Sequence, residues 1–247
     1  MDSWYKGMYG EHYYRASFAA MPAERTQKEV EFIRTVLNLP PGARVLDLCC
    51  GPGRHTLALA QLGYRMSGLD LSEHYIKLAR NHAKRENLDV DFQIGDMRRI
   101  PFRSKFDAVI NIFTSFGYFD SDEENASVIQ GVVGKLKPGG KFLLDVINRD
   151  YIVRNMTQSH WLDRGDILVL QDHSFDPVTS RTEDRWVFLE KKSRKEFDVS
   201  IRLYALHEII ALFQRAGLTY QKAWGNFAGE PFDYTSQRII ALGVKPQ

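Results

Sequence analysis

Residues 45–60 read VLDLCCGPGRHTLALA, and this stretch decides the fold. An apolar run ends at Leu48, a Gly-Pro-Gly turn follows at 51–53, and apolar residues recur at helical spacing from Thr56. The pattern predicts a buried strand, a tight turn and the start of a helix. Because glycine has no Cβ, a ligand can approach the backbone of the turn, and the helix start offers it unpaired N–H groups.

The segments on either side alternate between strand and helix patterns. After a helix at 22–37 we expect strands at 44–48, 64–69, 90–94, 106–113 and 141–148, and helices at 56–62, 73–85 and 122–135. A helix at 206–216 and strands at 218–224 and 238–244 follow near the end of the chain. Repeated alternation predicts an α/β fold, a Rossmann-like sheet of seven mostly parallel strands with helices on both faces.

Residues 150–205 interrupt this alternation. Three segments, 167–175, 182–190 and 197–204, alternate apolar and polar residues and are separated by turn-forming residues, which is typical of antiparallel hairpins. We therefore expect a small three-stranded antiparallel insertion at 150–205 within a domain made of 40–149 and 206–247. Residues 1–39 form a separate N-terminal helical segment in this scheme.

Composition excludes several classes of protein. The chain has 33 basic and 31 acidic residues in 247, without the clustered positive charge of a nucleic-acid-binding face. No apolar run is long enough to cross a membrane, and no signal peptide is evident. The only cysteines, Cys49 and Cys50, are adjacent, so neither a disulfide nor a metal site is expected, and we interpret them as small apolar fillers. These features favour a cytoplasmic location.

Two common nucleotide-binding turns do not match residues 51–56. A phosphate loop requires Gly-Lys-Ser/Thr at the helix start, whereas this chain has Gly53-Arg54-His55-Thr56. A dinucleotide fingerprint requires a third glycine three residues after the second, and that position is again Thr56.

Five segments in order decide between the remaining possibilities. VLDLCCGPGRHT, MSGLDLSEHYIKLAR, DFQIGDMRRIPF, FDAVINIFTSFGYF and LKPGGKFLLDVIN lie within residues 40–149. In sequence and spacing this region resembles the class I S-adenosylmethionine-dependent methyltransferases of the small-molecule type. The resemblance implies S-adenosylmethionine as cofactor, with S-adenosylhomocysteine as its product.

The resemblance also implies which residues hold the cofactor: Asp47, Gly51, Gly53, Asp70, Leu71, Asp96, Met97, Asn111, Tyr14 and Arg25. A carboxylate at Asp70 can accept hydrogen bonds from ribose hydroxyls, and one at Asp96 can accept from the adenine amine. Taken singly, Asp70 can equally be a helix N-terminal acid and Asp96 a turn residue. Their order along five matching segments favours the cofactor interpretation.

The expected reaction is in-line transfer of a methyl group to nitrogen or oxygen of a small molecule, through positioning and exclusion of water. No catalytic residue is evident. The segment after the fourth strand, residues 111–118, lacks the Asn/Asp-Pro-Pro-aromatic pattern of enzymes that methylate DNA bases or amides. Candidates for the acceptor pocket are Thr114, Tyr118, Trp186, Tyr204 and Tyr234.

By position, the insertion is similar to the flap of some small-molecule N-methyltransferases, which covers the acceptor or makes a dimer contact, and residues 1–39 are expected to act as a lid. The expected partners are a small acceptor and a second copy of the chain, but not nucleic acid or a membrane. Methylation of a protein or RNA, transfer of another group, and non-catalytic cofactor binding remain open alternatives.

Overall fold

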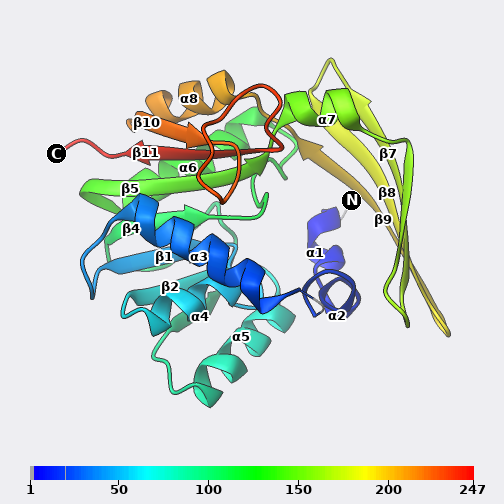
Figure 1. Cartoon of the computed structure of the whole chain (residues 1–247), viewed down its shortest axis with the longest axis horizontal. Helices are drawn as coiled ribbons and strands as arrows, with labels where there is room; N and C mark the ends of the chain where they lie inside the picture. Colours follow the sequence, from blue (N-terminus) through cyan, green and yellow to red (C-terminus); the bar gives the residue numbers. More distant parts are fainter. Residues whose placement is uncertain (1–2, 20) are drawn as a thin grey trace.

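The computed structural model describes residues 3–19 and 21–247. Its main sheet has seven strands in the order β10-β11-β5-β4-β1-β2-β3 (Figure 1). The strands are β1 (Arg44–Leu48), β2 (Arg65–Asp70), β3 (Asp91–Ile94), β4 (Phe106–Asn111), β5 (Leu136–Ile147), β10 (Thr219–Trp224) and β11 (Arg238–Val244). β1 to β5 are parallel, and β11 is antiparallel to both β5 and β10. The predicted fold class is confirmed.

Helices cover both faces of the sheet because its strands are apolar on both sides. They are α3 (Ala23–Leu37), α4 (Arg54–Gln61), α5 (Glu73–Arg85), α6 (Asp122–Lys135) and α8 (Leu206–Arg215). Two successive residues of β1 point to the two faces of the sheet. Leu46 packs in the core with α6 and α8, whereas Val45 packs with α3 and α4. The edge strand β3 packs through Phe92 on α4 and α5.

The insertion is a separate antiparallel sheet, in the order β6-β7-β8-β9. Its strands are β6 (Ser159–Asp163), β7 (Leu168–Asp176), β8 (Arg181–Glu190) and β9 (Ser193–Arg202), preceded by α7 (Arg149–Asn155). The expectation of three strands was wrong, because β6 was missed. Four of the five residues of β6 are exposed and none is buried, so β6 lacks the one-sided apolar pattern on which strand prediction depends. α7 has no buried residue and gives no periodic signal either.

The N-terminal segment lies between the main sheet and the insertion (Figure 1). It contains α1 (Trp4–Met8), α2 (Glu11–Tyr13) and a π-helical turn, η1 (Tyr14–Phe18). Met8 and Ala16 form a small core with Val169, Phe188 and Val199 of the insertion. Within residues 3–19 and 21–247, no helix is long and apolar enough to cross a membrane.

Candidate functional site

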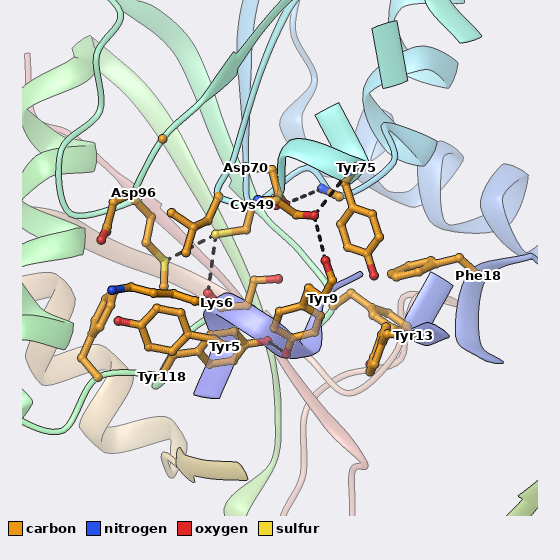
Figure 2. A pocket seen from close by; sticks show the side chains of 18 residues that line it. Tyr5, Lys6, Tyr9, Tyr13, Phe18, Cys49, Asp70, Tyr75, Asp96 and Tyr118 are labelled. Carbon is orange, nitrogen blue, oxygen red and sulfur yellow. Dashed lines mark hydrogen bonds between the residues drawn. The ribbon is translucent and has the colours of Figure 1, made fainter. Parts of the chain in front are cut away.

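A cavity lies beyond the carboxyl ends of the parallel strands. The chain leaves β1 toward β2 on one side and later returns to β4 on the other, so the order of strands reverses between β1 and β4. Open parallel sheets bind ligands at such a point. Cys49, Asp70, Asp96 and Ser115 follow or end four of these strands, and all four line the cavity. In Figure 2, Asp96, Cys49 and Asp70 lie along one side, facing Tyr118, Tyr5 and Tyr9 on the other.

The two glycines of the opening turn have different tasks. Gly51 has φ +56°, lines the cavity, and has no heavy atom within 4 Å of the position a Cβ would take, so its backbone is bare toward a ligand. Gly53 has φ +86°, and a Cβ there would lie 3.0 Å from Ala79 Cβ and 3.2 Å from Phe92. Gly51 therefore gives access to the turn, whereas Gly53 lets α4 begin tightly against α5 and β3.

Asp70 is fixed in place by the backbone around it. Its carboxylate accepts hydrogen bonds from the N–H of Gly51 and from the N–H of Ser72, both at 2.8 Å. Burial raises the pKa of Asp70 to about 6, against the lowering effect of these two hydrogen bonds. The remaining lone pairs of the carboxylate are available to hydroxyl groups of a ligand.

Asp96 is held by Arg98, which donates to it from Nε at 3.1 Å and from Nη2 at 2.5 Å. Partial burial raises the pKa of Asp96, but the hydrogen bonds from Arg98 outweigh that effect and the pKa is lowered. Arg98 also pairs with Glu124 at 2.5 Å and lies over the ring of Phe119. Asp96 is therefore a charged acceptor at neutral pH. Arg98, which holds it in position, and Glu124, which pairs with Arg98, do not line the cavity.

Cys49 adopts a backbone conformation that favours glycine, with φ 62°. Its side chain lines the cavity, and Sγ lies 3.4 Å from the sulfur of Met97. Burial and nearby carboxylates raise the pKa of the Cys49 thiol, so the side chain is a neutral, polarisable wall. Cys50 is the buried apolar filler that was expected, in the core between α4 and α5, whereas Cys49, expected to be a filler as well, lines the cavity.

Tyrosines from the N-terminal segment close the cavity from the other side. The hydroxyls of Tyr9 and Tyr118 are 2.7 Å apart, and Tyr118 donates to the carbonyl of Thr114 at 2.9 Å. Since Tyr118 has only one proton, Tyr9 is the donor of the pair. Ser72 donates to the backbone carbonyl of Tyr9 at 2.7 Å, which ties the N-terminal segment to the residues beside Asp70.

The turn after β4 reaches the cavity through a strained backbone. Phe113 and Thr114 have φ of 70° and 59°, and the N–H of Phe113 donates to the carboxylate of Asp145 at 2.7 Å. Arg238 binds the same fully buried carboxylate at 2.5 and 2.9 Å, and also donates to Thr114 Oγ1 at 2.9 Å. Such conformations persist where surrounding contacts hold them, and here they turn Phe113 and Ser115 into the cavity lining.

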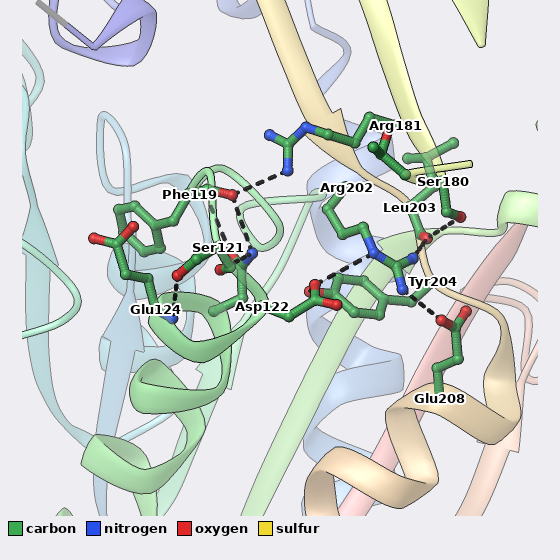
Figure 3. A network of polar contacts seen from close by, with 12 residues as sticks. Phe119, Ser121, Asp122, Glu124, Ser180, Arg181, Arg202, Leu203, Tyr204 and Glu208 are labelled. Carbon is green, nitrogen blue, oxygen red and sulfur yellow. Dashed lines mark hydrogen bonds and ion pairs between the residues drawn. The ribbon is translucent and has the colours of Figure 1, made fainter. Parts of the chain in front are cut away.

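Arg202 joins the insertion to the main domain (Figure 3). Its guanidinium pairs with Glu208 of α8 at 2.5 Å and with Asp122 of α6 at 3.3 Å. The backbone N–H of Arg202 donates to the carbonyl of Gly117 at 2.8 Å. From the neighbouring strand, Arg181 donates to the carbonyl of Phe119 at 3.0 Å. These contacts fix β9 against residues 117–122, the segment that carries Tyr118 into the cavity.

Of the predicted site residues, six line this one cavity: Gly51, Asp70, Leu71, Asp96, Met97 and Tyr118. Two others lie directly beneath it. Asp47 is 2% exposed and accepts a hydrogen bond from Thr56 Oγ1 at 2.6 Å, so it orients the turn from below. Asn111 is 1% exposed and donates to the carbonyl of Leu48 at 2.9 Å, while its Oδ1 has no partner among the described residues.

The other predicted residues do not line the cavity. Arg25 pairs with Glu29 and lies over the ring of Phe113, and Tyr14 packs beside His74 and Tyr75. Among the acceptor candidates, the structure places Thr114 in the Asp145–Arg238 network and Trp186 in the core of the insertion, against Tyr13. Tyr204 is buried against Phe116, and Tyr234 is 70% exposed beside Arg154.

Several lining residues were missed individually: Tyr5, Lys6, Tyr9, Tyr13, Phe18, Cys49, Ser72, Tyr75, Gly95, Phe113, Ser115 and Phe119. The tyrosine-rich N-terminus did predict a lid with tyrosines near the cofactor, but without a clear period it could not say which ones face inward. Tyr75 had a usable signal, because it lies one helical turn after the Ser72 cap and so shares the end of α5 that faces Asp70.

These residues fit the cofactor that the sequence resemblance implies. Gly51 leaves space beside bare backbone, Asp70 and Asp96 are acceptors at adjacent strand ends, and Leu71 and Met97 supply apolar walls. The hydroxyl of Tyr75 is buried beside the same cavity without a partner among the described residues. The cavity lining therefore offers hydrogen-bond acceptors, apolar surface and one unpaired hydroxyl donor, which together suit a nucleoside with a charged tail.

Comparison with known proteins agrees with this geometry. Residues 45–140 match the family model described as a methyltransferase domain. The chain is 32% identical to the putative methyltransferase YqeM of Bacillus subtilis, covering 84% of this chain and 86% of that protein. It is 28% identical to the cypemycin N-terminal methyltransferase of a Streptomyces species, covering 81% and 82%. The solved structure of the CcbJ methyltransferase from Streptomyces caelestis shares the fold, with a TM-score of 0.83 at 19% identity over 98% and 99% of the two chains. The chain therefore belongs to the class I S-adenosylmethionine-dependent methyltransferases.

Proposed function

We propose that this methyltransferase acts on nitrogen or oxygen of a small acceptor that is enclosed between the main sheet and the N-terminal segment. The observation that carries this proposal is the closure of the cavity by Tyr5, Tyr9 and Tyr13 of that segment. A protein or RNA substrate requires an open trough at the carboxyl edge of the sheet. Here the edge is covered by a lid that packs in turn on the insertion. We assign residues 3–19 as the lid and 150–205 as the acceptor cap on the same ground. The rest of the predicted lid segment, 1–39, includes α3, which packs on the main sheet instead.

We assign the cofactor seat to the strand ends. The backbone at Gly51 takes the aminocarboxypropyl tail, Asp70 accepts from the ribose hydroxyls, and Asp96 accepts from the adenine amine. Leu71 and Met97 flank the adenine as apolar walls. Asp47 and Gly53 act indirectly, because they set the shape of the turn rather than line the cavity.

When bound, the cofactor supplies an electrophilic methyl group on a positively charged sulfur. The protein's own part is then to hold the acceptor atom in line and to keep water out. The lid serves the second purpose, because the hydrogen bond from Tyr9 to Tyr118 ties it to the cavity wall formed by the segment after β4. Positioning of this kind needs no single catalytic side chain.

The relatives support a small acceptor without deciding its identity. One is named as an N-terminal methyltransferase of cypemycin, and others are named as ubiquinone biosynthesis O-methyltransferases. A dimer contact through the insertion stays a prediction, which sedimentation of the full chain checks.

The cofactor seat is tested by replacing Asp70 with alanine. Binding of S-adenosylmethionine and S-adenosylhomocysteine, measured by calorimetry, is expected to fall at least about a hundredfold, because hydrogen bonds to a charged acceptor are lost. Asp91→Ala is the matched control, because Asp91 is exposed at the opposite end of the neighbouring strand β3. Equal affinity in Asp70→Ala and the wild type would remove the assignment.

A further inference from the structure

The cavity has an aromatic wall opposite the cofactor seat. It contains Tyr5, Tyr9, Tyr13, Phe18 and Tyr118 (Figure 2). Phe119 also lines the cavity and packs edge-on against Tyr5. The rings of Tyr9 and Tyr118 are stacked with an interplanar angle of 9°. The faces of aromatic rings carry negative potential and attract cations. Such a wall therefore favours a group that is positively charged or becomes so.

The described residues that line the cavity offer no base for a hydroxyl acceptor. No histidine is among the described lining residues, and the two lining carboxylates, Asp70 and Asp96, belong to the cofactor seat. Tyr118 donates its proton to the carbonyl of Thr114 and Tyr9 donates to Tyr118, while burial raises the pKa of both tyrosines. A hydroxyl must lose a proton as it is methylated, whereas the lone pair of a neutral amine is already free.

A groove beside the cavity is acidic. It shares Tyr5, Tyr118 and Phe119 with the cavity and adds Asp120, Glu124, Glu196 and Asp198, with Arg98 as its only basic residue among the described ones. Glu124 pairs with Arg98 at 2.5 Å, and Glu196 pairs with Arg185 at 2.6 Å and also with Arg194. No ion pair between described residues involves Asp120 or Asp198. The groove therefore presents net negative charge, which concentrates cations beside the cavity, behind the shared side chains of Tyr5, Tyr118 and Phe119.

The hydroxyl of Tyr75, already counted with the cofactor seat, marks the cavity as a ligand site without favouring nitrogen over oxygen. Tyr75 is 2% exposed, lines the cavity, and its hydroxyl has no partner among the described residues. A buried hydroxyl without a partner is costly, and nearly all such groups in proteins are satisfied. A polar ligand atom in this cavity satisfies it.

We infer that the methyl acceptor is an amine, which approaches along the acidic groove and is methylated against the aromatic wall. The inference rests on the proposed function and narrows its choice between nitrogen and oxygen. The amine gives its proton to water before it enters. Its lone pair then forms the N–C bond, the S–C bond breaks with its electron pair left on sulfur, and nitrogen takes over the positive charge. A product that still carries an N–H releases that proton to water.

The test compares two probes of nearly equal shape, choline and its uncharged analogue 3,3-dimethylbutan-1-ol. Each is titrated by calorimetry into the full chain saturated with S-adenosylhomocysteine, so the readout is binding and not turnover. Choline is expected to bind at least about tenfold more tightly, as a desolvated cation on aromatic faces does. Equal affinity for the two probes, or preference for the alcohol, overturns the inference.

Variants locate the effect. The double variant Asp120→Asn with Asp198→Asn is expected to lower choline affinity by a factor of about three to ten and to weaken its dependence on salt. Asp89→Asn, an exposed carboxylate before β3 at the far edge of the sheet, is the control and is expected to change neither. Affinity for S-adenosylhomocysteine is measured first in each protein. If the wild type does not bind S-adenosylhomocysteine, the proposed function is contradicted. If it binds S-adenosylhomocysteine normally but does not distinguish the two probes, only the inference of an amine acceptor is contradicted.

Discussion

Asp70 combines two properties that oppose each other in the free protein. Its carboxylate is held by two backbone N–H groups, yet burial raises its pKa to about 6. The charged form is the one that can accept from ribose hydroxyls with both oxygens. The seat is therefore built around a carboxylate that is kept ready for a ligand at some cost to the unliganded state.

This gives a pH dependence with a defined sign. Below about pH 6 Asp70 takes up a proton in the free protein, so the affinity for S-adenosylhomocysteine is expected to fall about tenfold for each further pH unit. Above that pH, Asp70 causes no further change. Calorimetry between pH 5 and 8 measures the profile, with Asp70→Asn as the variant in which this step disappears. A flat wild-type profile down to pH 5 contradicts the assignment.

For single residues, the sequence predicts a place in the site well only where the residue follows a recognisable strand of the main sheet. Asp70 and Asp96 were assigned through the family resemblance, and both lie at or just after strand ends, which a parallel sheet brings to the same edge. Tyr204 and Trp186 show the limit: aromatic residues in or beside the insertion were candidates, but tertiary packing turned one onto Phe116 and the other onto Tyr13. Side-chain direction in a loop or flap depends on contacts far away in the sequence, which no local pattern records.

The elements meet at a joint where backbone touches backbone. Gly117 has φ +94°, and a Cβ added there would overlap the carbonyl oxygen of Arg202. Both the conformation and the space thus require glycine at the point where β9 is fixed against the main domain.

Gly117→Ala is expected to lower the free energy of unfolding by at least about 2 kcal/mol, because the strain adds to the displacement of β9. Chemical denaturation measures the change. Gly134→Ala is the control, because Gly134 lies in α6 with nothing within 4 Å of an added Cβ, and there stability is expected to stay equal or rise by up to about 1 kcal/mol. If both variants lose similar amounts of unfolding free energy, the close contact between Gly117 and the backbone of Arg202 does not contribute specifically to stability.

Elements with a buried face were predicted well, and the others were not. α5 was expected at 73–85 and spans Glu73–Arg85, because its apolar face, Ser72 cap and basic last turn agree. β6 and α7 bury nothing, so their existence depends on β7 and on the preceding strand rather than on their own residues. β5 begins earlier than expected, at Leu136, where its pairing with β4 shifts register between Phe106 and Ala108.

In the whole molecule, the N-terminal segment contacts both halves. It is hydrogen-bonded to Ser72 of the main domain, and Arg164 of the insertion donates to the carbonyl of Ala16 at 3.1 Å. A ligand enclosed beneath this segment can enter only when the segment moves. Its contacts are few compared with those of the sheet, which is the usual character of a lid.

Ligand binding is therefore expected to protect residues 3–19 selectively. Saturation with S-adenosylhomocysteine should slow amide hydrogen exchange in this segment at least about tenfold, since opening must then compete with binding. α8 lies away from the cavity and serves as the internal control. Exchange that slows equally in both regions points to global stabilisation, and unchanged exchange in 3–19 means that the segment does not cover the ligand.

The small core that holds Met8 against Val169 and Val199 also sets an order of events during synthesis. Met8 finds these partners only after the chain has been made as far as Val199. The main sheet needs α8, β10 and β11 from the end of the chain, and the N-terminal segment needs the insertion just before them. Contacts this distant in sequence form late. Docking of the N-terminal segment therefore waits for the insertion, and until then the cofactor seat has no cover.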